Sequence, residues 1–527
     1  MKKIFTFILG VGTMLCANAQ MAEGVQARIY AYDLQQEETT SVVNNTTVKA
    51  YNFTFKTNTA AAGTPTVTLF GDGLNDVVIQ ATATDNTNKS WTATVHAANG
   101  EIVAGSYNWK VTVSADPVKT YTQLNQDGTN FSFYRPYGVV VDQSPESDNF
   151  GRVYVSNNYA GTARSNTYSR ATTAGIYTFN PELTPLNDKK AYSCSVVGDG
   201  TISGGSPQDL NIDIEGNLYL ADNTPATSGI YLVEPNNEFQ ATAIFTGTRD
   251  NSTGNITNTD GDIISSRAGA VGVYGSGSER KIYTISGTGN PYNVNRYDIG
   301  TAKTWGEAPS WTATTLYDGT IKVQVVNINA SIEPIKTGGY WIAQYRGSSS
   351  KANPGAFYCN SKNEIEYSSD ADGGVTGVGS RNGALAVCEN AGLVAYSLGG
   401  KIGIMSYTVN DDNTITVGDI YQYQLKVLNR ANALAFDYAG NLYAVTSTTE
   451  AMEVATIPTD NNICTTPAKS TLLAVFSDGD KLTSIDGINA DANAPVEYYN
   501  LQGVKVENPE KGIFIKKQGS KTTKVVF

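Results

Sequence analysis

Histidine is almost absent from this chain of 527 residues, which contains only His96. Histidine is the commonest general base in enzymes, and a Ser/His/Asp triad requires it. Residues 118–478 contain no histidine, which excludes a Ser/His/Asp mechanism within that region. We expect His96 itself to be a surface residue of a strand.

Charged residues are scarce, at 16% of the chain, and acidic residues outnumber basic ones, which gives a formal net charge of −12. Proteins that bind nucleic acid usually carry an excess of Lys and Arg. We therefore do not expect nucleic acid as a partner. The composition also excludes a helical bundle. Few residues are charged, and the 51 Gly and 31 Tyr are typical of short strands and tight turns.

Long hydrophobic runs are missing after the first residues, so we expect no transmembrane span. At the N-terminus, Lys2 and Lys3 precede an apolar run that ends at Cys16, and Ala17-Asn18-Ala19 follows. This order predicts a signal peptide over 1–19. Lipid attachment at Cys16 is disfavoured, because a lipoprotein signal requires a small residue just before the modified cysteine, and Leu15 is not small. The protein is expected to be exported to the periplasm, the cell surface or the extracellular space.

Cysteines are few and widely separated once the leader is removed: Cys194, Cys359, Cys388 and Cys464. No CxxC or Cys/His pattern is present, so a zinc site is not expected. Two interpretations stay open for these residues. They form one or two disulfides, or they are small hydrophobic side chains buried on strands.

The chain does contain alternating apolar and polar segments, which predict an all-β protein. In residues 20–116 this pattern indicates a small β-sandwich. The hairpin segment at 98–105, before the strand at 105–113, resembles the FlgD-like immunoglobulin-type modules of bacterial exported proteins. The resemblance implies a spacer or docking domain without chemistry of its own.

Residues 118–478 repeat themselves. A short strand recurs in six copies, marked by Tyr154, Tyr219, Tyr283, Trp341, Val394 and Tyr443. Another apolar strand precedes each marker, and several antiparallel strands in each of six repeats predict a six-bladed β-propeller. The copies at 213–222 and 437–443 resemble NHL-type propellers, a group that implies the fold but includes both binders and enzymes.

Residues 484–527 contain YNLQG at 499–503, GIFI at 512–515 and a terminal KVVF. This segment resembles the C-terminal sorting domains of proteins that Bacteroidota export across the outer membrane. The resemblance implies a passage through outer-membrane secretion machinery, or display on the cell surface.

Carboxylates are the first candidates for chemistry in the repeats. Asp142, Asp213 and Asp437 each follow the first strand of their repeat, and by analogy with lactonase-type propellers they could bind a divalent cation. The same positions are strand-to-strand turns, where Asp is favoured for turn geometry, and we prefer that interpretation. No cofactor is therefore expected, with a divalent cation as the alternative.

Arginines show the more unusual pattern. Four of them stand three residues before the small residue that opens the first strand of a repeat, and a serine takes this place in the second copy: Arg135, Arg267, Arg381, Arg430 and Ser206. In a propeller these positions lie at one mouth of the central channel. We predict a ligand-binding ring for carboxylate or sulfate groups. The alternative is that each arginine bonds the neighbouring blade.

The sequence therefore predicts an exported, surface-associated binding or scaffold protein that recognises an anionic glycan or a protein ligand. The alternative function is a metal-dependent hydrolase or lyase that uses channel carboxylates. The sequence identifies no catalytic residue.

Overall fold

The computed structural model is all-β and built from many small antiparallel sheets. It describes residues 25–97, 101–125, 128–164, 169–194, 196–197, 207, 209–222, 224–261, 263–266, 268–286, 294–304, 314–315, 331–343, 356–369, 383–398, 401–426, 428, 430–446, 450–475, 495–519 and 521–527. Within these residues, no helix has the length and apolar character required to cross a membrane.

The chain divides into two compact units. The larger contains residues Met1–Gln36, Phe53–Thr94 and Ser106–Leu472, and the smaller contains Glu37–Asn52, Val95–Gly105 and Leu473–Phe527. The larger unit includes residues 118–472 of the repeat region.

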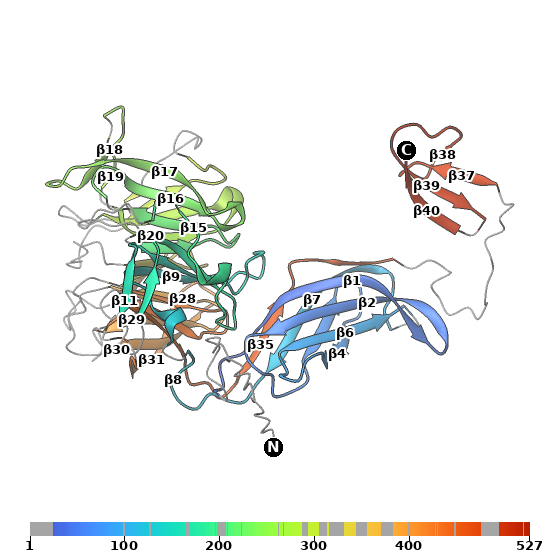
Figure 1. The fold of residues 1–527 in the computed structure, drawn as a ribbon, viewed down its shortest axis with the longest axis horizontal. Coiled ribbons are helices and arrows are strands. Elements are labelled where there is room, and N and C mark those ends of the chain that lie inside the picture. Colours follow the sequence, from blue (N-terminus) through green and yellow to red (C-terminus); the bar gives the residue numbers. More distant parts are fainter. Residues whose placement is uncertain are drawn as a thin grey trace, which may run out of the picture. The chain divides into compact units, whose positions relative to one another are not determined.

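Six antiparallel sheets follow one another in the described part of the repeat region (Figure 1). The first three comprise β9 (Pro136–Val141), β10 (Val153–Asn157) and β13 (Gly175–Phe179); β14 (Asp209–Ile212), β15 (Leu218–Asp222), β16 (Ser228–Glu234), β17 (Gln240–Arg249), β18 (Asn255–Thr257) and β19 (Ile263–Ser266); and β20 (Ala268–Tyr274), β21 (Lys281–Ser286), β22 (Val294–Asp298) and β23 (Thr314–Thr315).

The other three sheets have four strands each. They comprise β24 (Ser331–Pro334), β25 (Tyr340–Ala343), β26 (Ala356–Cys359) and β27 (Ile365–Ser368); β28 (Leu385–Cys388), β29 (Leu393–Leu398), β30 (Lys401–Val409) and β31 (Ile415–Gln424); and β32 (Ala433–Phe436), β33 (Leu442–Thr446), β34 (Ala451–Thr456) and β8 (Thr122–Gln123). A separate hairpin of β11 (Gly161–Arg164) and β12 (Ser169–Thr172) follows β10.

The repeated strand of the sequence is the second strand of each sheet. Its side chains are buried on both faces, as in β10, β15 and β33, because each sheet packs against two others. Aromatic and branched side chains suit such a strand. This explains why Tyr154, Tyr219 and Tyr443 are fully buried.

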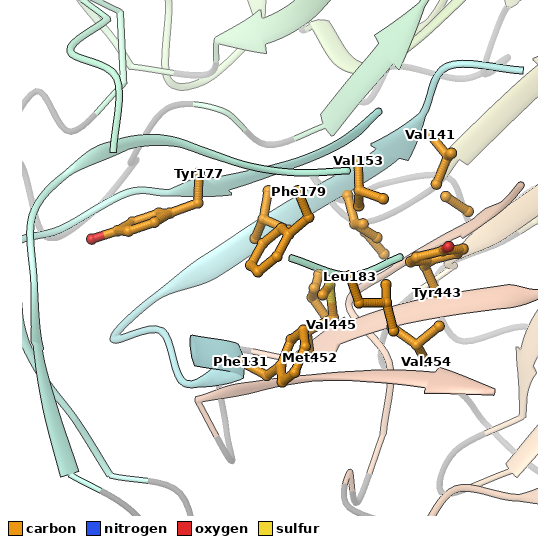
Figure 2. Packing of buried hydrophobic residues seen from close by; sticks show 14 of the residues in the cluster. Phe131, Val141, Val153, Tyr177, Phe179, Leu183, Tyr443, Val445, Met452 and Val454 are labelled. Atoms are coloured by element: carbon orange, nitrogen blue, oxygen red, sulfur yellow. The ribbon is translucent and has the colours of Figure 1, made fainter. Parts of the chain in front are cut away.

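Each sheet shares a hydrophobic cluster with the next sheet along the chain. A further cluster joins the sixth sheet to the first (Figure 2): Val141 and Val153 pack with Tyr443 and Val454. The first strands contact one another in the same cyclic order, β9, β14, β20, β24, β28, β32 and again β9. In addition, β8, which precedes the first sheet in the chain, pairs with β34 of the last.

Two further sheets flank this region, and we call them the flanking sheets. One has the order β1-β2-β6-β5 and the other β35-β7-β3-β4, with β36 also paired to β7. Their strands are β1 (Ala31–Val43), β2 (Thr46–Thr57), β3 (Thr66–Phe70), β4 (Val77–Gln80), β5 (Thr82–Ala83), β6 (Ser90–His96), β7 (Gly105–Ser114), β35 (Ile463–Pro467) and β36 (Leu472–Ala474).

The pairing of β35 with β7 joins residues about 350 positions apart in the chain, with Cys464 opposite Val113. The sequence analysis had placed 463–467 in the repeat region. Their alternating exposure gave no indication of the partner strand, because any sheet edge can pair with such a strand.

The C-terminal residues form a sheet of their own, in the order β38-β37-β39-β40. Its strands are β37 (Val496–Tyr499), β38 (Lys505–Val506), β39 (Ile513–Gln518) and β40 (Lys521–Val526). Tyr498 and Phe514 both contact Phe527, with ring centroids 5.3 and 6.0 Å apart.

Among the described residues, Cys194, Cys359, Cys388 and Cys464 are buried with free thiols. Burial raises the pKa of Cys388 and of Cys464 to about 12, so these thiols are uncharged at neutral pH. Of the two interpretations from the sequence, the structure agrees with small buried side chains.

Candidate functional site

A cavity of about 460 Å³ lies where the carboxyl ends of the first strands converge. All six sheets of the repeat region contribute to its walls through β9, β14, β20, β24, β28 and β32 or the turns after them. We call it the central cavity. Protein cavities of this size and position are where small ligands usually bind.

Glu333 is the cavity residue with the most unusual environment. Successive side chains of a strand point to opposite faces. Ile332 of β24 is fully buried in the core between sheets, so the side chain of the next residue, Glu333, faces the cavity. Both carboxylate oxygens accept the side-chain amide of Asn211 from β14, at 3.1 Å each. Burial raises the pKa of Glu333 to about 8, and the charge of Asp209 adds to the increase, while the Asn211 bond opposes it.

Asp209 stands two residues before Asn211 on the same face of β14. Its carboxylate accepts the backbone N–H groups of Leu210 and of Val271, at 3.0 and 3.1 Å. Because Val271 belongs to β20, this carboxylate ties the second sheet to the third. Burial raises its pKa to about 7 despite both bonds.

A second lining glutamate, Glu389, follows β28. Its carboxylate accepts the backbone N–H of Lys336 at 3.2 Å. Burial raises the pKa of Glu389, although the backbone bond and the charge of Lys336 favour the ionised form.

The aromatic residues Tyr274, Phe436 and Tyr438 also line the cavity, although the Phe436 side chain is fully buried in the core between two sheets. Burial and the charge of Glu389 raise the pKa of Tyr274. Among the described residues that line the cavity, none is Lys, Arg or His, whereas four carry carboxyl groups: Glu146, Asp213, Glu333 and Glu389. A cavity with this lining attracts positive charge, and aromatic faces add to the attraction for organic cations.

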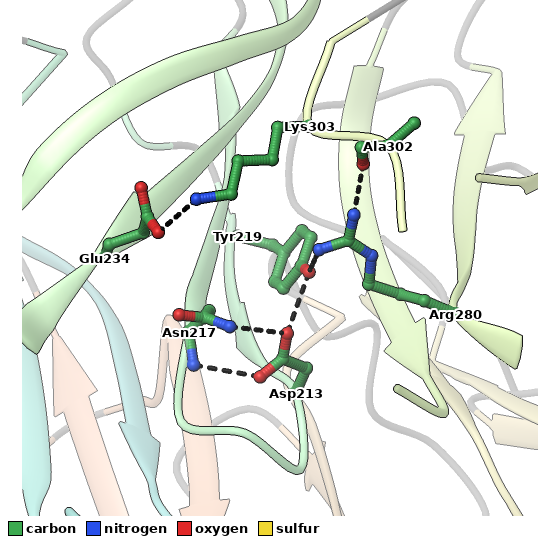
Figure 3. A network of polar contacts seen from close by, with 7 residues as sticks. All are labelled: Asp213, Asn217, Tyr219, Glu234, Arg280, Ala302 and Lys303. Atoms are coloured by element: carbon green, nitrogen blue, oxygen red, sulfur yellow. Dashed lines mark hydrogen bonds and ion pairs between the residues drawn. The ribbon is translucent and has the colours of Figure 1, made fainter. Parts of the chain in front are cut away.

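Each of the three turn aspartates accepts a backbone N–H within its own turn. Oδ1 of Asp213 accepts the backbone N–H groups of Glu215 and Asn217, both at 2.9 Å. Its Oδ2 accepts the Tyr219 hydroxyl at 2.8 Å (Figure 3). Asp437 accepts the N–H groups of Ala439 and Asn441, and Asp142 that of Ser144. These bonds agree with the turn interpretation.

Burial raises the pKa of Asp142 to about 7 and of Asp437 to about 6, and it also raises the pKa of Asp213. Within the described residues, no group of three or more His, Cys, Asp or Glu side chains is placed to hold a metal ion.

Two of the five residues in the predicted arginine ring are described. Arg135 is exposed, with its guanidinium 5.6 Å from the ring centre of Tyr134. Arg430 is half-buried and already engaged in contacts. The strands that follow them, β9 and β32, pack against each other. Arg267, Arg381 and Ser206 lie outside the described residues, so the ring stays a prediction.

Arg280, which is not part of the predicted ring, bonds a neighbouring sheet. It lies before β21 and donates to the Tyr219 hydroxyl of the second sheet at 3.0 Å and to the carbonyl of Ala302 (Figure 3). It also donates to the carbonyl of Gly300. The sequence could not indicate this role, because Arg280 shares no register with other arginines.

Glu333 and Asn211 were also missed. Both are the third residue of the first strand of their sheet, where side chains face the cavity. A search for polar residues at that position would have found them, but the fourth repeat matched the others too poorly for its first strand to be placed.

A comparison of the chain with models of known protein families found no match, and a comparison with curated proteins found none either.

Proposed function

We propose that this protein is a binding protein whose ligand, a small organic cation, occupies the central cavity of a six-bladed β-propeller. The observation that carries the proposal is the cavity itself, to which all six sheets contribute and whose described lining combines carboxyl groups with aromatic rings. Such a lining suits an ammonium group with apolar substituents.

Several observations support the propeller. The first strands contact one another in a cycle, and the six hydrophobic clusters follow the same cycle. The pairing of β8 with β34 joins the two ends of the repeat region in one sheet. Radial repetition of this kind protects short sheet edges.

We further propose that the protein is exported, with an immunoglobulin-like sandwich formed by the flanking sheets and a sorting-like module at 484–527. Expression of the full chain in a Gram-negative host is expected to yield a protein that begins at Gln20, as measured by intact mass. Replacement of Ala19 by Arg should block cleavage. A mature protein that retains its first nineteen residues would contradict the export proposal.

The ligand proposal makes a pH-dependent prediction. Benzyltrimethylammonium keeps its charge at every pH, so only the protein titrates. Glu333, with a pKa of about 8, is mostly neutral at pH 7 and mostly ionised at pH 9. Asp209 is the charged group that acts on its pKa. Glu389 also lines the cavity and is influenced by the charge of Lys336. Affinity measured by calorimetry should therefore rise about tenfold from pH 7 to pH 9.

The variant Glu333→Gln should reduce this pH dependence to the part that comes from Asp209, whose pKa is about 7, and should weaken binding about tenfold at pH 9. Glu364→Gln is the matched control, because Glu364 lies in the exposed turn between β26 and β27 of the same sheet. No uptake of the cation by the wild type would contradict the proposal. Preference for benzenesulfonate, lost in an Arg135→Ala/Arg430→Ala double variant, would instead support an anionic glycan or protein ligand.

A metal-dependent hydrolase or lyase is the second candidate. The raised pKa of Glu333 favours this function, because a carboxyl group that is neutral at pH 7 can donate a proton to a leaving group. A stoichiometric divalent ion in the purified protein would move the preference to this function.

A further inference from the structure

Two turns that line the central cavity have the same sequence pattern, Asp-x-x-Gly-Asn, at 213–217 and 437–441. Their internal bonding is also the same. In each, the aspartate accepts the backbone N–H groups two and four residues later, at 2.9 and 2.9 Å in the first turn and 3.1 and 2.8 Å in the second. The two turns differ in the two residues between Asp and Gly and in their surroundings.

The second turn contacts β35 and the chain segment before β1. Its Tyr438 is 8% exposed, whereas Ile214, the equivalent residue of the first turn, is 44% exposed. The Tyr438 ring packs between Tyr30 and Phe150, at centroid distances of 6.3 and 5.2 Å. Its hydroxyl donates to the carbonyl of Thr465 in β35 at 3.2 Å.

Arg28 holds the same turn from the chain segment before β1. Its backbone N–H donates to Oδ1 of Asn441, and its carbonyl accepts the Asn441 side-chain amide, at 3.0 and 2.9 Å. Its guanidinium donates to the carbonyls of Ala439, Ile457 and Pro458, at 3.4, 3.0 and 2.8 Å. The planar guanidinium presents its donors from three nitrogen atoms in a fixed geometry, whereas the three donors of an ammonium group all radiate from one nitrogen.

A second cavity residue reaches β35 by another route. The Asn390 side-chain amide donates to the carbonyl of Tyr438 at 2.9 Å and lies 3.9 Å from the Cys464 sulfur. The cavity wall at Asn390 and Tyr438 is therefore attached to β35 at two points.

We infer that Arg28 and Tyr30 are positioning residues, and that docking of the flanking sheets holds the 437–441 turn in the shape that the ligand requires. The effect on ligand affinity rests on the proposed function, while the effect on the turn does not. Because coupling between two binding events is reciprocal, a ligand in the cavity also strengthens the docking.

Hydrogen exchange of the full chain tests the inference without any ligand. In Arg28→Ala, the amides of Ala439 and Asn441 should exchange several-fold faster, because the guanidinium bonds to the carbonyls of Ala439, Ile457 and Pro458 are lost. The backbone bonds of residue 28 to Asn441 remain. The amides of Glu215 and Asn217 in the matched turn should keep their rates. A general loss of stability would accelerate both turns alike.

Two further variants sharpen the test. Arg28→Lys retains the charge and should give an intermediate acceleration, and it serves as the readout if Arg28→Ala does not fold. Lys56→Ala, which removes an exposed ion pair with Asp33 in the flanking sheets, should change neither turn. Unchanged exchange at Ala439 and Asn441 in both Arg28 variants would overturn the inference.

Binding of benzyltrimethylammonium provides the second arm. If the wild type binds it, Arg28→Ala should weaken the affinity several-fold, and equal affinity would overturn the coupling to the ligand. If the wild type does not bind it, the proposed function fails, and the exchange rates still decide whether Arg28 positions the turn.

Discussion

Replacement of Arg280 by alanine should lower the free energy of unfolding by about 3 kcal/mol, since it removes charge-assisted hydrogen bonds from a buried position. Arg280 is 5% exposed. Its guanidinium bonds the Tyr219 hydroxyl and two carbonyls, those of Gly300 and Ala302. The substitution leaves both carbonyls without this donor in the interface between the second and third sheets. Urea denaturation followed by tyrosine fluorescence would measure the change.

Lys303→Ala is the matched control for that interface. The Lys303 ammonium pairs with Glu234 across the same two sheets at 2.6 Å (Figure 3), but both side chains are partly exposed. Exposed ion pairs contribute little, so the loss should stay below about 1 kcal/mol. If the two variants were equally stable, burial of Arg280 would not be the source of its contribution.

Replacement of Asn462 by alanine should also destabilise the protein by about 3 kcal/mol, because it leaves buried backbone groups without partners. The Asn462 side chain, 5% exposed, accepts the N–H of Ile29 and donates to the carbonyls of Ala27 and Asp116, all at 2.9 Å. Three segments that are distant in the chain meet at this one amide. Thermal unfolding monitored by circular dichroism would measure the loss.

The neighbouring Asn461 is exposed and provides the control. Asn461→Ala should change stability by no more than about 0.5 kcal/mol, as is usual for surface positions. A small effect of Asn462→Ala would show that water can replace the amide at this junction.

The strands themselves were predictable from sequence. Alternation and the six copies of one buried strand indicated an all-β chain, because a strand packed on both faces requires a short run of apolar and aromatic residues. The turn role of Asp213 and Asp437 was equally predictable, since both precede Gly and Asn at fixed spacing and their bonds are local.

The candidate site was not predictable in the same way. The arginine register pointed to the amino ends of the first strands, whereas the central cavity lies at their carboxyl ends. Glu333 and Asn211 come from strands about 120 residues apart. No local pattern links them, because their proximity results from the packing of the second sheet near the fourth.

The sequence by itself determined the strands, the turns and the low charge, all of which depend on residues within a few positions of one another. The tertiary structure alone decided which carboxyl groups are buried together, which arginine spans two sheets, and that β35 pairs with β7. Those outcomes depend on contacts between distant segments, and burial changes the chemistry of a side chain only once such contacts have formed.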